Sequence, residues 1–317
     1  MTMIPSDARI AVLIPCYNEE KAIAQVVSDF RKALPSASIY VYDNNSRDGT
    51  VAAARAAGAI VRGEPLQGKG NVVRRMFADI EADIYVLVDG DATYDAASAP
   101  AMIEALYAGP LDMVNGARVT EIKAAYRAGH RFGNVLLSTM VAWIFGDRFK
   151  DMLSGYRIFS RRYVKSFPAL AAGFEIETEF TVHALEVRMP TAEVRTPYKD
   201  RPVGSVSKLS TFKDGFRILW MIVVLIKEER PLQFFSLIAL FLALVSGVLI
   251  EPVVTEYLAT GLVPRFPTAI LSMGLMILSF LSLACGMILD TVTRGRREAK
   301  RIAYLSIPAP GAEAAGR

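Results

Sequence analysis

The chain has 317 residues, of which 52% are hydrophobic and 21% charged, and it carries a formal net charge of +4. This length can hold one α/β domain of about 200 residues and a further part, and the hydrophobic fraction indicates that the further part is not soluble. The two cysteines, Cys16 and Cys285, exclude a disulfide-rich secreted protein. Residues 1–9 contain no apolar segment of the kind found in signal peptides, so we expect the first domain to stay in the cytoplasm.

Short apolar runs alternate with amphipathic stretches from the N-terminus onward. We expect strands over 10–14, 39–42, 59–62 and 84–88, and helices over 21–34, 51–57 and 71–80. This alternation predicts a parallel sheet with helices on both faces. Ligands of such sheets bind at the carboxyl ends of the strands. Polar clusters stand at those ends, in residues 15–19, 43–50 and 67–70, so three loops should converge on one edge.

The apolar run 84–88 is followed by Asp89, Gly90 and Asp91. We expect Gly90 to let the backbone turn without a Cβ penalty, so that both carboxylates reach one point at the sheet edge. Two carboxylates and several waters suit Mg²⁺ or Mn²⁺ that carries a phosphorylated ligand. The alternative is a solvated turn or a helix cap, but the position directly after a buried strand favours a metal site.

The other polar segments also have a structural alternative. Residues 43–50 are rich in Asn, Asp, Ser and Gly, which favour turns and helix N-caps. Lys69 stands between two glycines at an expected helix start, where it could contact phosphate or lie in a flexible loop. A Walker A motif is absent, as is a G-x-G-x-x-G fingerprint after the first strand. These absences exclude the commonest nucleotide motifs and leave a site centred on a base and a metal ion.

The polar segments form an ordered set of motifs: Ile14-Pro15-x-Tyr17-Asn18-Glu19-Glu20, Asp43-x-x-Ser46-x-Asp48-x-Thr50, Gly68-Lys69-Gly70 and Asp89-x-Asp91. This set resembles family 2 glycosyltransferases of the GT-A fold. Three later motifs are Asn115-Gly116-Ala117-Arg118, Asp151-x-x-Ser154-Gly155-Tyr156-Arg157 and Arg201-x-x-Gly204-Ser205-x-Ser207-Lys208. They are similar to those of polyprenyl-phosphate sugar transferases, the relatives of dolichyl-phosphate mannose synthase and undecaprenyl-phosphate glucosyltransferases. The resemblance implies an α/β catalytic domain that is Rossmann-like, with a mostly parallel sheet.

The resemblance also implies roles for individual residues. The nucleotide sugar would be held by Pro15, Tyr17, Asn18, Glu19, Asp43, Asn45, Lys69 and Asp89. Asp89 and Asp91 would bind Mg²⁺ or Mn²⁺ and reach the diphosphate. The diphosphate and the acceptor phosphate would be held by Arg118, Arg131, Ser154, Arg201, Ser205 and Lys208. Asp151 and Arg157 complete the implied catalytic set, with Asp151 orienting Arg157 or another basic group. For Asp151 a helix-end salt bridge remains an equal alternative.

The sequence departs from the family pattern at two places. Asn44 and Asn45 stand where the common pattern has a second acid and a glycine, which affects the geometry of base binding. Thr93 stands where dolichyl-phosphate mannose enzymes usually have Gln, which weakens an inference to GDP-mannose and favours a UDP-sugar such as UDP-glucose.

A few acids and histidines are left without a clear assignment. His130 and His183 lack a metal-ligand partner in the sequence, so solvated or packed imidazoles are expected. Glu175, Glu177 and Glu179 alternate along one segment, and residues at i and i+2 of a helix do not face each other. One of the three could contact a basic residue of the site, but the sequence does not select which.

The last third of the chain contains two long apolar runs. Residues 231–250 and 268–289 are uncharged runs of 20 and 22 residues, each long enough to cross a bilayer as a helix. A buried core hairpin is the alternative. Basic residues lie on the outer flanks of both runs, so the positive-inside rule predicts that both ends face the cytoplasm. The apolar residues 218–226 are too few to cross and predict an interfacial helix.

These observations predict four regions: a catalytic domain over 1–210, an interfacial region over 211–230, a transmembrane hairpin over 231–290 and a basic cytoplasmic tail over 291–317. The tail cluster consists of Arg294, Arg296, Arg297, Lys300 and Arg301. Its position after an apolar run favours anionic lipid over nucleic acid, so no nucleic-acid partner is expected.

We therefore predict an inverting, metal-dependent glycosyltransferase of the inner (plasma) membrane. It would move a sugar from a nucleotide donor to polyprenyl (undecaprenyl) phosphate. A GDP-mannose-dependent polyprenyl- or dolichyl-phosphate mannose synthase is the alternative, and a non-catalytic membrane scaffold is a more distant one. A processive polysaccharide synthase is disfavoured because the Gln-x-x-Arg-Trp motif is absent. A homo-oligomer, either dimer or tetramer, is left open.

Overall fold

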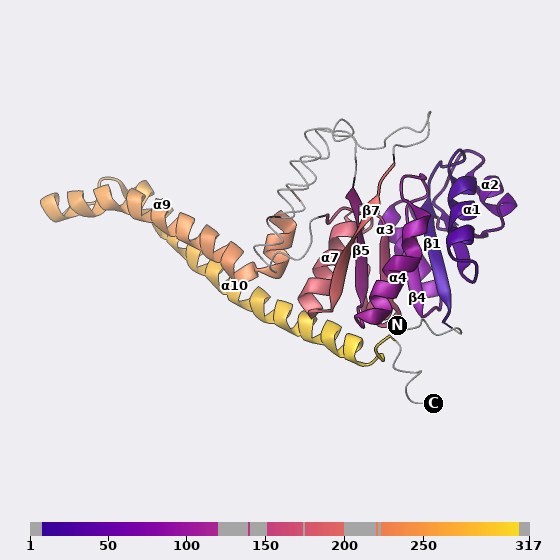
Figure 1. Cartoon of the computed structure of the whole chain (residues 1–317). Coiled ribbons are helices and arrows are strands. Elements are labelled where there is room, and N and C mark those ends of the chain that lie inside the picture. Colours follow the sequence, from indigo (N-terminus) through magenta and orange to yellow (C-terminus); the bar gives the residue numbers. More distant parts are fainter. Residues whose placement is uncertain are drawn as a thin grey trace. The chain divides into compact units, whose positions relative to one another are not determined.

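The computed structural model describes residues 8–119, 139, 151–173, 175–199, 220 and 223–310 (Figure 1). The chain divides into two compact units. The first comprises Met1–Ile218 together with Lys300–Arg317, and the second comprises Leu219–Ala299. The end of the chain therefore belongs to the first unit.

The first unit is built on a seven-stranded sheet. Its strands are β1 (Ile10–Cys16), β2 (Ser38–Asp43), β3 (Ile60–Gly63), β4 (Ile84–Leu87), β5 (Met113–Val119), β6 (Arg157–Ser160) and β7 (Thr191–Pro197). They lie in the order β3-β2-β1-β4-β6-β5-β7. Among these strands β6 alone runs antiparallel to its neighbours, β4 and β5. The predicted, mostly parallel α/β sheet is thus confirmed.

Helices connect the strands of this sheet. They are α1 (Ile23–Ala33), α2 (Thr50–Ala56), α3 (Lys69–Asp79), α4 (Ala99–Ala108), α6 (Arg161–Ser166) and α7 (Ile176–Val187), with the short 3-10 helix η1 (Ala96–Ser98) before α4. The four strands and three helices expected over the first 88 residues all form, with ends that differ from the predicted ones by at most two residues. Continuous apolar runs located the strands, because both faces of the sheet are covered, and amphipathic stretches located the helices.

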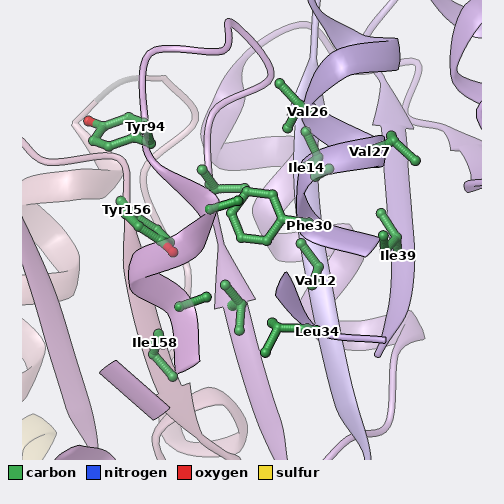
Figure 2. Close-up of a cluster of buried hydrophobic side chains, with 14 of the residues drawn as sticks. Val12, Ile14, Val26, Val27, Phe30, Leu34, Ile39, Tyr94, Tyr156 and Ile158 are labelled. Carbon is green, nitrogen blue, oxygen red and sulfur yellow. The ribbon is translucent and has the colours of Figure 1, made fainter. Parts of the chain in front are cut away.

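A hydrophobic core joins α1 to the sheet (Figure 2). Val26, Val27 and Phe30 of α1 are buried against Val12 and Ile14 of β1. The ring of Phe30 meets that of Tyr156 edge-on, with 6.0 Å between the centroids. The hydroxyl of Tyr156 is buried and has no hydrogen-bond partner among the described residues. This core holds the carboxyl ends of β1 and β4 in place.

The second unit contains most of a helical hairpin. Helix α9 spans Pro231–Thr260 and helix α10 spans Phe266–Leu305, with mean hydropathies of 2.5 and 2.1 in their most apolar windows. Only 17% of each window is buried within the structure, whereas the core helix of a soluble protein is mostly buried. By length and composition both helices can cross a membrane. The two predicted apolar helices are confirmed, and α10 continues to Leu305, so residues 291–305 are helical.

Small residues at seven-residue intervals form the contact between α9 and α10. On α9 the buried positions include Ala239, Ser246 and Val253, and on α10 they are Ser272, Ser279, Gly286 and Thr293. Ser279 Oγ donates to Ala239 O at 2.7 Å, and Ser246 Oγ donates to Ser272 O at 2.8 Å. Small residues and hydroxyl–carbonyl bonds are what hold helices together in lipid, and a strict seven-residue period gives a left-handed supercoil.

The C-terminal end of α10 contributes buried polar contacts to the first unit. The hydroxyl of Tyr304 donates to Asp112 Oδ2 at 2.8 Å, and Lys300 Nζ lies 2.6 Å from Glu186 Oε2. The guanidinium of Arg162 binds Asp112 and lies over the ring of Tyr304. The side chains of Asp112 and Glu186 are both fully buried.

Most of the basic cluster that the sequence assigned to lipid is paired within the protein. Lys300 pairs with Glu186, Arg294 with Asp290, and Arg296 and Arg297 with Glu229. Four of the five charges therefore have an internal partner, which leaves less charge for anionic lipid than the sequence indicated. Of the expected interfacial helix over 218–226, Trp220 and residues 223–226 are helical, and the other residues lie outside the part of the chain that the structure describes.

Candidate active site

The loops after β1 and β2 are joined by hydrogen bonds at the carboxyl edge of the sheet. Asn18 N donates to Ser46 Oγ and Arg47 N donates to Asn18 Oδ1, each at 2.8 Å. Glu19 N donates to Thr50 Oγ1 at 2.8 Å. Asn18 adopts a positive φ of 53°, which Asn tolerates better than most residues. The two loops therefore form one preorganised surface beside Pro15 and Tyr17.

Asn44 ties the loop that precedes α3 to the end of β2. Its Nδ2 donates to Glu64 O and Leu66 O at 2.9 and 2.8 Å, and its Oδ1 accepts from Gly68 N at 2.7 Å and from Gln67 Nε2 at 3.2 Å. An aspartate could not donate the first two bonds, since a carboxylate only accepts. Asn44, which stands where the family pattern has an acid, thus has a structural role in holding this loop. In the sequence, the amide at this position was the one feature that could have indicated this role.

Asp43 and Asn45 flank Asn44 and face different partners. Asp43 Oδ2 accepts from Ser46 N at 3.1 Å, while Oδ1 is buried without a hydrogen-bond partner among the described residues. Asn45 has a φ of 65° and donates from Nδ2 to Pro65 O at 2.9 Å. A buried carboxylate oxygen without a partner is uncommon in folded proteins and indicates a missing donor.

Lys69 begins α3 and is held between two acids. Its Nζ lies 2.5 Å from Asp89 Oδ1 and 2.6 Å from Glu177 Oε1. Burial alone would lower the pKa of Lys69, but the charges of Asp89 and Glu177 outweigh burial, so its pKa is raised and the ammonium stays charged. Burial raises the pKa of Glu177, and the charge of Lys69 offsets part of this effect. Of the three alternating glutamates, Glu177 contacts a basic residue of this edge.

Asp89 and Asp91 follow β4 as the sequence predicted, but the reason given for Gly90 was wrong. Its φ is not positive; the left-handed residue is Ala92, with a φ of 60°. A Cβ on Gly90 would lie 2.6 Å from Cys16 Sγ, so this glycine is needed for close packing on β1.

Each of the two carboxylates is oriented by its neighbours. Asp91 is 4% exposed, and its Oδ1 accepts from Thr93 Oγ1 at 2.6 Å and from Thr93 N at 3.2 Å. Asp89 Oδ2 lies against Gly155, where a Cβ would approach it to 2.2 Å. Gly155 N in turn donates to the hydroxyl of Tyr94 at 2.8 Å. Residues 154–156, directly before β6, therefore pack against Asp89 and form a wall on one side of its carboxylate.

The donor set at this edge fits a hard divalent cation. Carboxylate oxygens are the protein ligands that Mg²⁺ and Mn²⁺ prefer. The described residues contain no group of three or more His, Cys, Asp and Glu side chains that could hold a metal. A cation at Asp89 and Asp91 would therefore depend on phosphate oxygens and water for its remaining ligands, as is usual for Mg²⁺ with nucleotides.

Asp151 orients Arg118. Arg118 Nε and one terminal nitrogen each lie 2.7 Å from an oxygen of Asp151, and the Arg118 main-chain N–H also donates to this carboxylate. Burial would raise the pKa of Asp151, but the bonds and charge of Arg118 overcome this effect and hold the pKa below its usual value. Asn115 Nδ2 donates to Asp151 O at 2.8 Å, which fixes the chain at this point.

Arg157 and Ser154 lie inside the protein. The guanidinium of Arg157 is fully buried and donates to Met152 O, Ser154 O and Thr181 Oγ1. Ser154 Oγ is also buried and donates to Gly116 O at 2.5 Å. Of the two alternatives for Asp151, Arg157 or another basic group, the second therefore holds, since Asp151 pairs with Arg118. Arg157 and Ser154 instead hold the loop that packs against Asp89.

Several predicted residues lie outside the described residues: Arg131, Arg201, Ser205, Lys208 and His130. His183 is packed against the rings of Tyr163 and Phe167, as expected, and burial lowers its pKa to about 3. Glu179 accepts from Leu170 N and Ala171 N and so has a structural contact of its own.

A mostly parallel sheet whose carboxyl edge carries an Asp-x-Asp pair defines a glycosyltransferase of the GT-A type. Residues 11–166 match the profile of Glycosyl transferase family 2. The chain is 33% identical over 305 residues to glycosyltransferase AglJ of Haloferax volcanii, a match that covers 95% of this chain and 100% of AglJ. It is 27% identical over 221 residues to the dolichyl-phosphate hexose transferase of the same organism, covering 70% of this chain and 95% of that protein.

Solved structures agree with this class. Glucosyl-3-phosphoglycerate synthase from Mycobacterium tuberculosis superposes with a TM-score of 0.57 at 22% identity, covering 70% of this chain and 81% of the synthase. A complex of that synthase with Mn²⁺, UDP and glucosyl-3-phosphoglycerate gives a TM-score of 0.56 at 23% identity, over 70% of this chain and 80% of the synthase. At this identity the likeness shows the fold alone. The chain belongs to glycosyl transferase family 2.

Proposed function

We propose that this glycosyltransferase is a metal-dependent, inverting enzyme that moves a sugar from a UDP-sugar, such as UDP-glucose, to polyprenyl (undecaprenyl) phosphate. The observation that carries the proposal is the presence on one chain of the Asp89–Asp91 edge and of two apolar helices of 30 and 40 residues. A hydrophilic donor and a lipid-borne acceptor require both. The catalytic domain and both termini would lie on the cytoplasmic side of the inner (plasma) membrane.

The donor's base would lie at the joined loops after β1 and β2. Asp43 Oδ1, buried and without a hydrogen-bond partner among the described residues, can accept from an N–H of the base. The nucleoside would be held by Pro15 near the end of β1 and, on the joined loops, by Tyr17, Asn18, Glu19 and Asn45. The fold neighbour glucosyl-3-phosphoglycerate synthase has been solved with Mn²⁺ and UDP, the donor class that we propose for this chain.

The diphosphate would lie at Asp89 and Asp91. A divalent cation bound there would stabilise the negative charge that develops on the leaving diphosphate. Thr93 holds Asp91, and Lys69 together with Gly155 holds Asp89, so both carboxylates are oriented before the donor arrives. The hydroxyl of Thr93 binds Asp91, and Thr93 stands where dolichyl-phosphate mannose enzymes usually have Gln, so GDP-mannose is the alternative donor.

The reaction would be a single displacement at the anomeric carbon of the sugar. An oxygen of the acceptor phosphate forms the new bond to this carbon, and the bond to the diphosphate breaks with its electron pair moving onto the diphosphate. The lipid phosphate is largely ionised at neutral pH, since its second pKa is about 6. The protein therefore has less need of a general base, and its main task is to hold two anions together.

Positive charge for the acceptor must come largely from residues other than Arg118. The charge of Arg118 is already matched by Asp151 in a bidentate pair. We therefore assign the acceptor phosphate to Arg131, Arg201, Ser205 and Lys208, with Arg118 at the side of the diphosphate. The relative named as a dolichyl-phosphate hexose transferase supports a lipid phosphate as the acceptor class.

The test is a screen of nucleotide sugars with the purified full-length protein, undecaprenyl phosphate and Mn²⁺. We expect a UDP-sugar to give a lipid-linked sugar of inverted configuration, and excess EDTA to abolish it. Transfer from GDP-mannose alone would favour the mannose synthase. Absence of transfer and of donor hydrolysis with every nucleotide sugar would favour a scaffold. Light scattering of the same sample would test for a dimer or tetramer.

A further inference from the structure

Glu177 contacts Lys69 near the carboxyl edge of the sheet, and the proposed function assigns no role to it. We propose that Glu177 is a positioning residue, which anchors Lys69 so that its ammonium fixes Asp89 without cancelling the charge that a divalent cation needs. This inference rests on the proposed function, because it concerns how the same site binds the cation together with a nucleotide diphosphate.

Glu177, Lys69 and Asp89 come from three different elements, and two ion pairs that share Lys69 join them. Glu177 lies in the first turn of α7, Lys69 begins α3, and Asp89 follows β4. The side chains of Glu177 and Lys69 are 7% and 8% exposed, whereas that of Asp89 is 31% exposed. Asp89 is therefore the member that can meet a ligand, and the other two lie behind it.

Glu177 is a fixed point because α7 is tied to the start of α3. Asn71 N donates to Ala172 O at 3.3 Å, which joins α3 to the loop before α7. Glu179 accepts from Leu170 N at 2.9 Å and from Ala171 N at 2.8 Å, which closes the same loop onto α7. Glu179 therefore binds the backbone of the loop, whereas Glu177 binds Lys69.

The charges at this edge explain how Glu177, as a second partner of Lys69, can help Asp89 to bind a cation. Asp89, Asp91 and Glu177 are three carboxylates, and Lys69 is the ammonium that joins Asp89 to Glu177. Because Lys69 is shared between two acids, Asp89 keeps much of its negative charge for a cation. Without Glu177 the ammonium would pair with Asp89 alone and would oppose the cation. Removing a residue that orients a metal ligand costs about 10–100-fold in metal affinity.

A purely structural role for Glu177 makes a different prediction. If Glu177 only neutralises a buried lysine, its loss should lower the stability of the protein and leave the binding of Mn²⁺ and nucleotide by the folded fraction unchanged. Binding affinity and thermal stability must therefore be measured on the same samples.

The experiment uses the full-length protein in detergent micelles with UDP and Mn²⁺ as probes. Four variants are compared by calorimetry and by thermal unfolding: Glu177→Gln, Lys69→Met, the double variant, and Glu186→Gln as a control, since Glu186 lies in the same helix and its buried side chain also pairs with a lysine, Lys300. We expect Glu177→Gln to weaken binding of UDP in the presence of Mn²⁺ by about tenfold or more. Glu186→Gln should change this affinity less than twofold. The double variant should bind like Lys69→Met alone, because Glu177 acts through the lysine.

The proposal is overturned if folded Glu177→Gln binds UDP and Mn²⁺ as the wild type does, or if its loss adds fully to that of Lys69→Met. If Glu177→Gln does not fold, Glu177→Asp takes its place, since it keeps the charge but shortens the reach to Lys69, and the same outcomes decide. Wild-type protein that binds no nucleotide would overturn the proposed function as well, whereas normal wild-type binding with an unaffected Glu177→Gln would overturn this inference alone.

Discussion

Replacing Gly155 by alanine should damage the donor site more than the fold. The added Cβ would lie 2.2 Å from Asp89 Oδ2, against 3.4 Å or more for an ordinary contact. The Asp89 carboxylate must therefore move by about 1.2 Å, because the wall formed by the main chain cannot yield in a close-packed interior. Lys69 holds the other oxygen of Asp89 at 2.5 Å, so this shift breaks or bends the ion pair.

A displacement of about 1 Å at a reacting group can cost about 100-fold in rate, whereas overpacking of this kind costs about 1–3 kcal/mol of stability. We expect Gly155→Ala to lose about 100-fold in transfer while it still unfolds cooperatively.

The matched control is Gly173→Ala. Its Cβ would also make a close contact, at 2.4 Å, but with the carboxylate end of Glu175, a partly exposed side chain that can rotate away. Transfer is measured with a UDP-sugar and undecaprenyl phosphate, and stability by thermal unfolding. Transfer by Gly155→Ala at the level of Gly173→Ala would refute the argument that Gly155 positions Asp89.

Four further predictions concern single side chains. Asp91→Asn should lower transfer by orders of magnitude with little loss of stability, and undiminished wild-type turnover in excess EDTA would count against a metal at this edge. Tyr156→Phe should leave stability unchanged or raise it by about 1 kcal/mol, because it removes a buried hydroxyl without a partner among the described residues; a clear fall in Tm would contradict this. Asp151→Asn should lower stability at pH 7 and flatten its acid dependence. The arginine partner holds the pKa of Asp151 low, so this stabilisation is fully present above about pH 4, the unfolded value, and is lost as the pH falls through the folded pKa; parallel pH profiles for both proteins would disprove it. Tyr304→Phe should lower stability by about 1 kcal/mol through loss of its bond to the buried Asp112, and an unchanged unfolding curve in detergent would show that this contact contributes nothing.

The sequence predicted the regular elements of the sheet because hydrophobic period and turn residues determine them locally. The runs over β1, β2, β3 and β4 needed no information from elsewhere in the chain. Strand β6 was different, since its antiparallel pairing with β4 joins residues 70 to 76 positions apart. Pairings of that kind depend on the whole topology and leave no local pattern.

The site was predictable at the level of loops but not of individual contacts. The Asp89–Asp91 pair follows directly from a strand that ends at the edge of the sheet. The choice of Glu177 among three alternating acids depended on the rotation of α7, and the pairing of Asp151 with Arg118 depended on the neighbouring strand β5. The role of Gly90 was misjudged because a close contact with Cys16 and a left-handed turn both call for glycine, and the sequence alone does not distinguish them.

The contacts of Lys300 and Tyr304 impose an order on the biosynthesis of the protein. Glu186 and Lys300 are 114 residues apart in the chain, and α9 and most of α10 lie between them. At about 5–20 residues per second, a ribosome takes roughly 6–23 s to supply the lysine after it has made the glutamate. During this time Glu186 lacks Lys300, and Asp112, which can already pair with Arg162, lacks Tyr304. A nascent chain that stops before the end of α10 therefore lacks part of the first unit as well, so completion of this unit cannot precede synthesis of the two apolar helices.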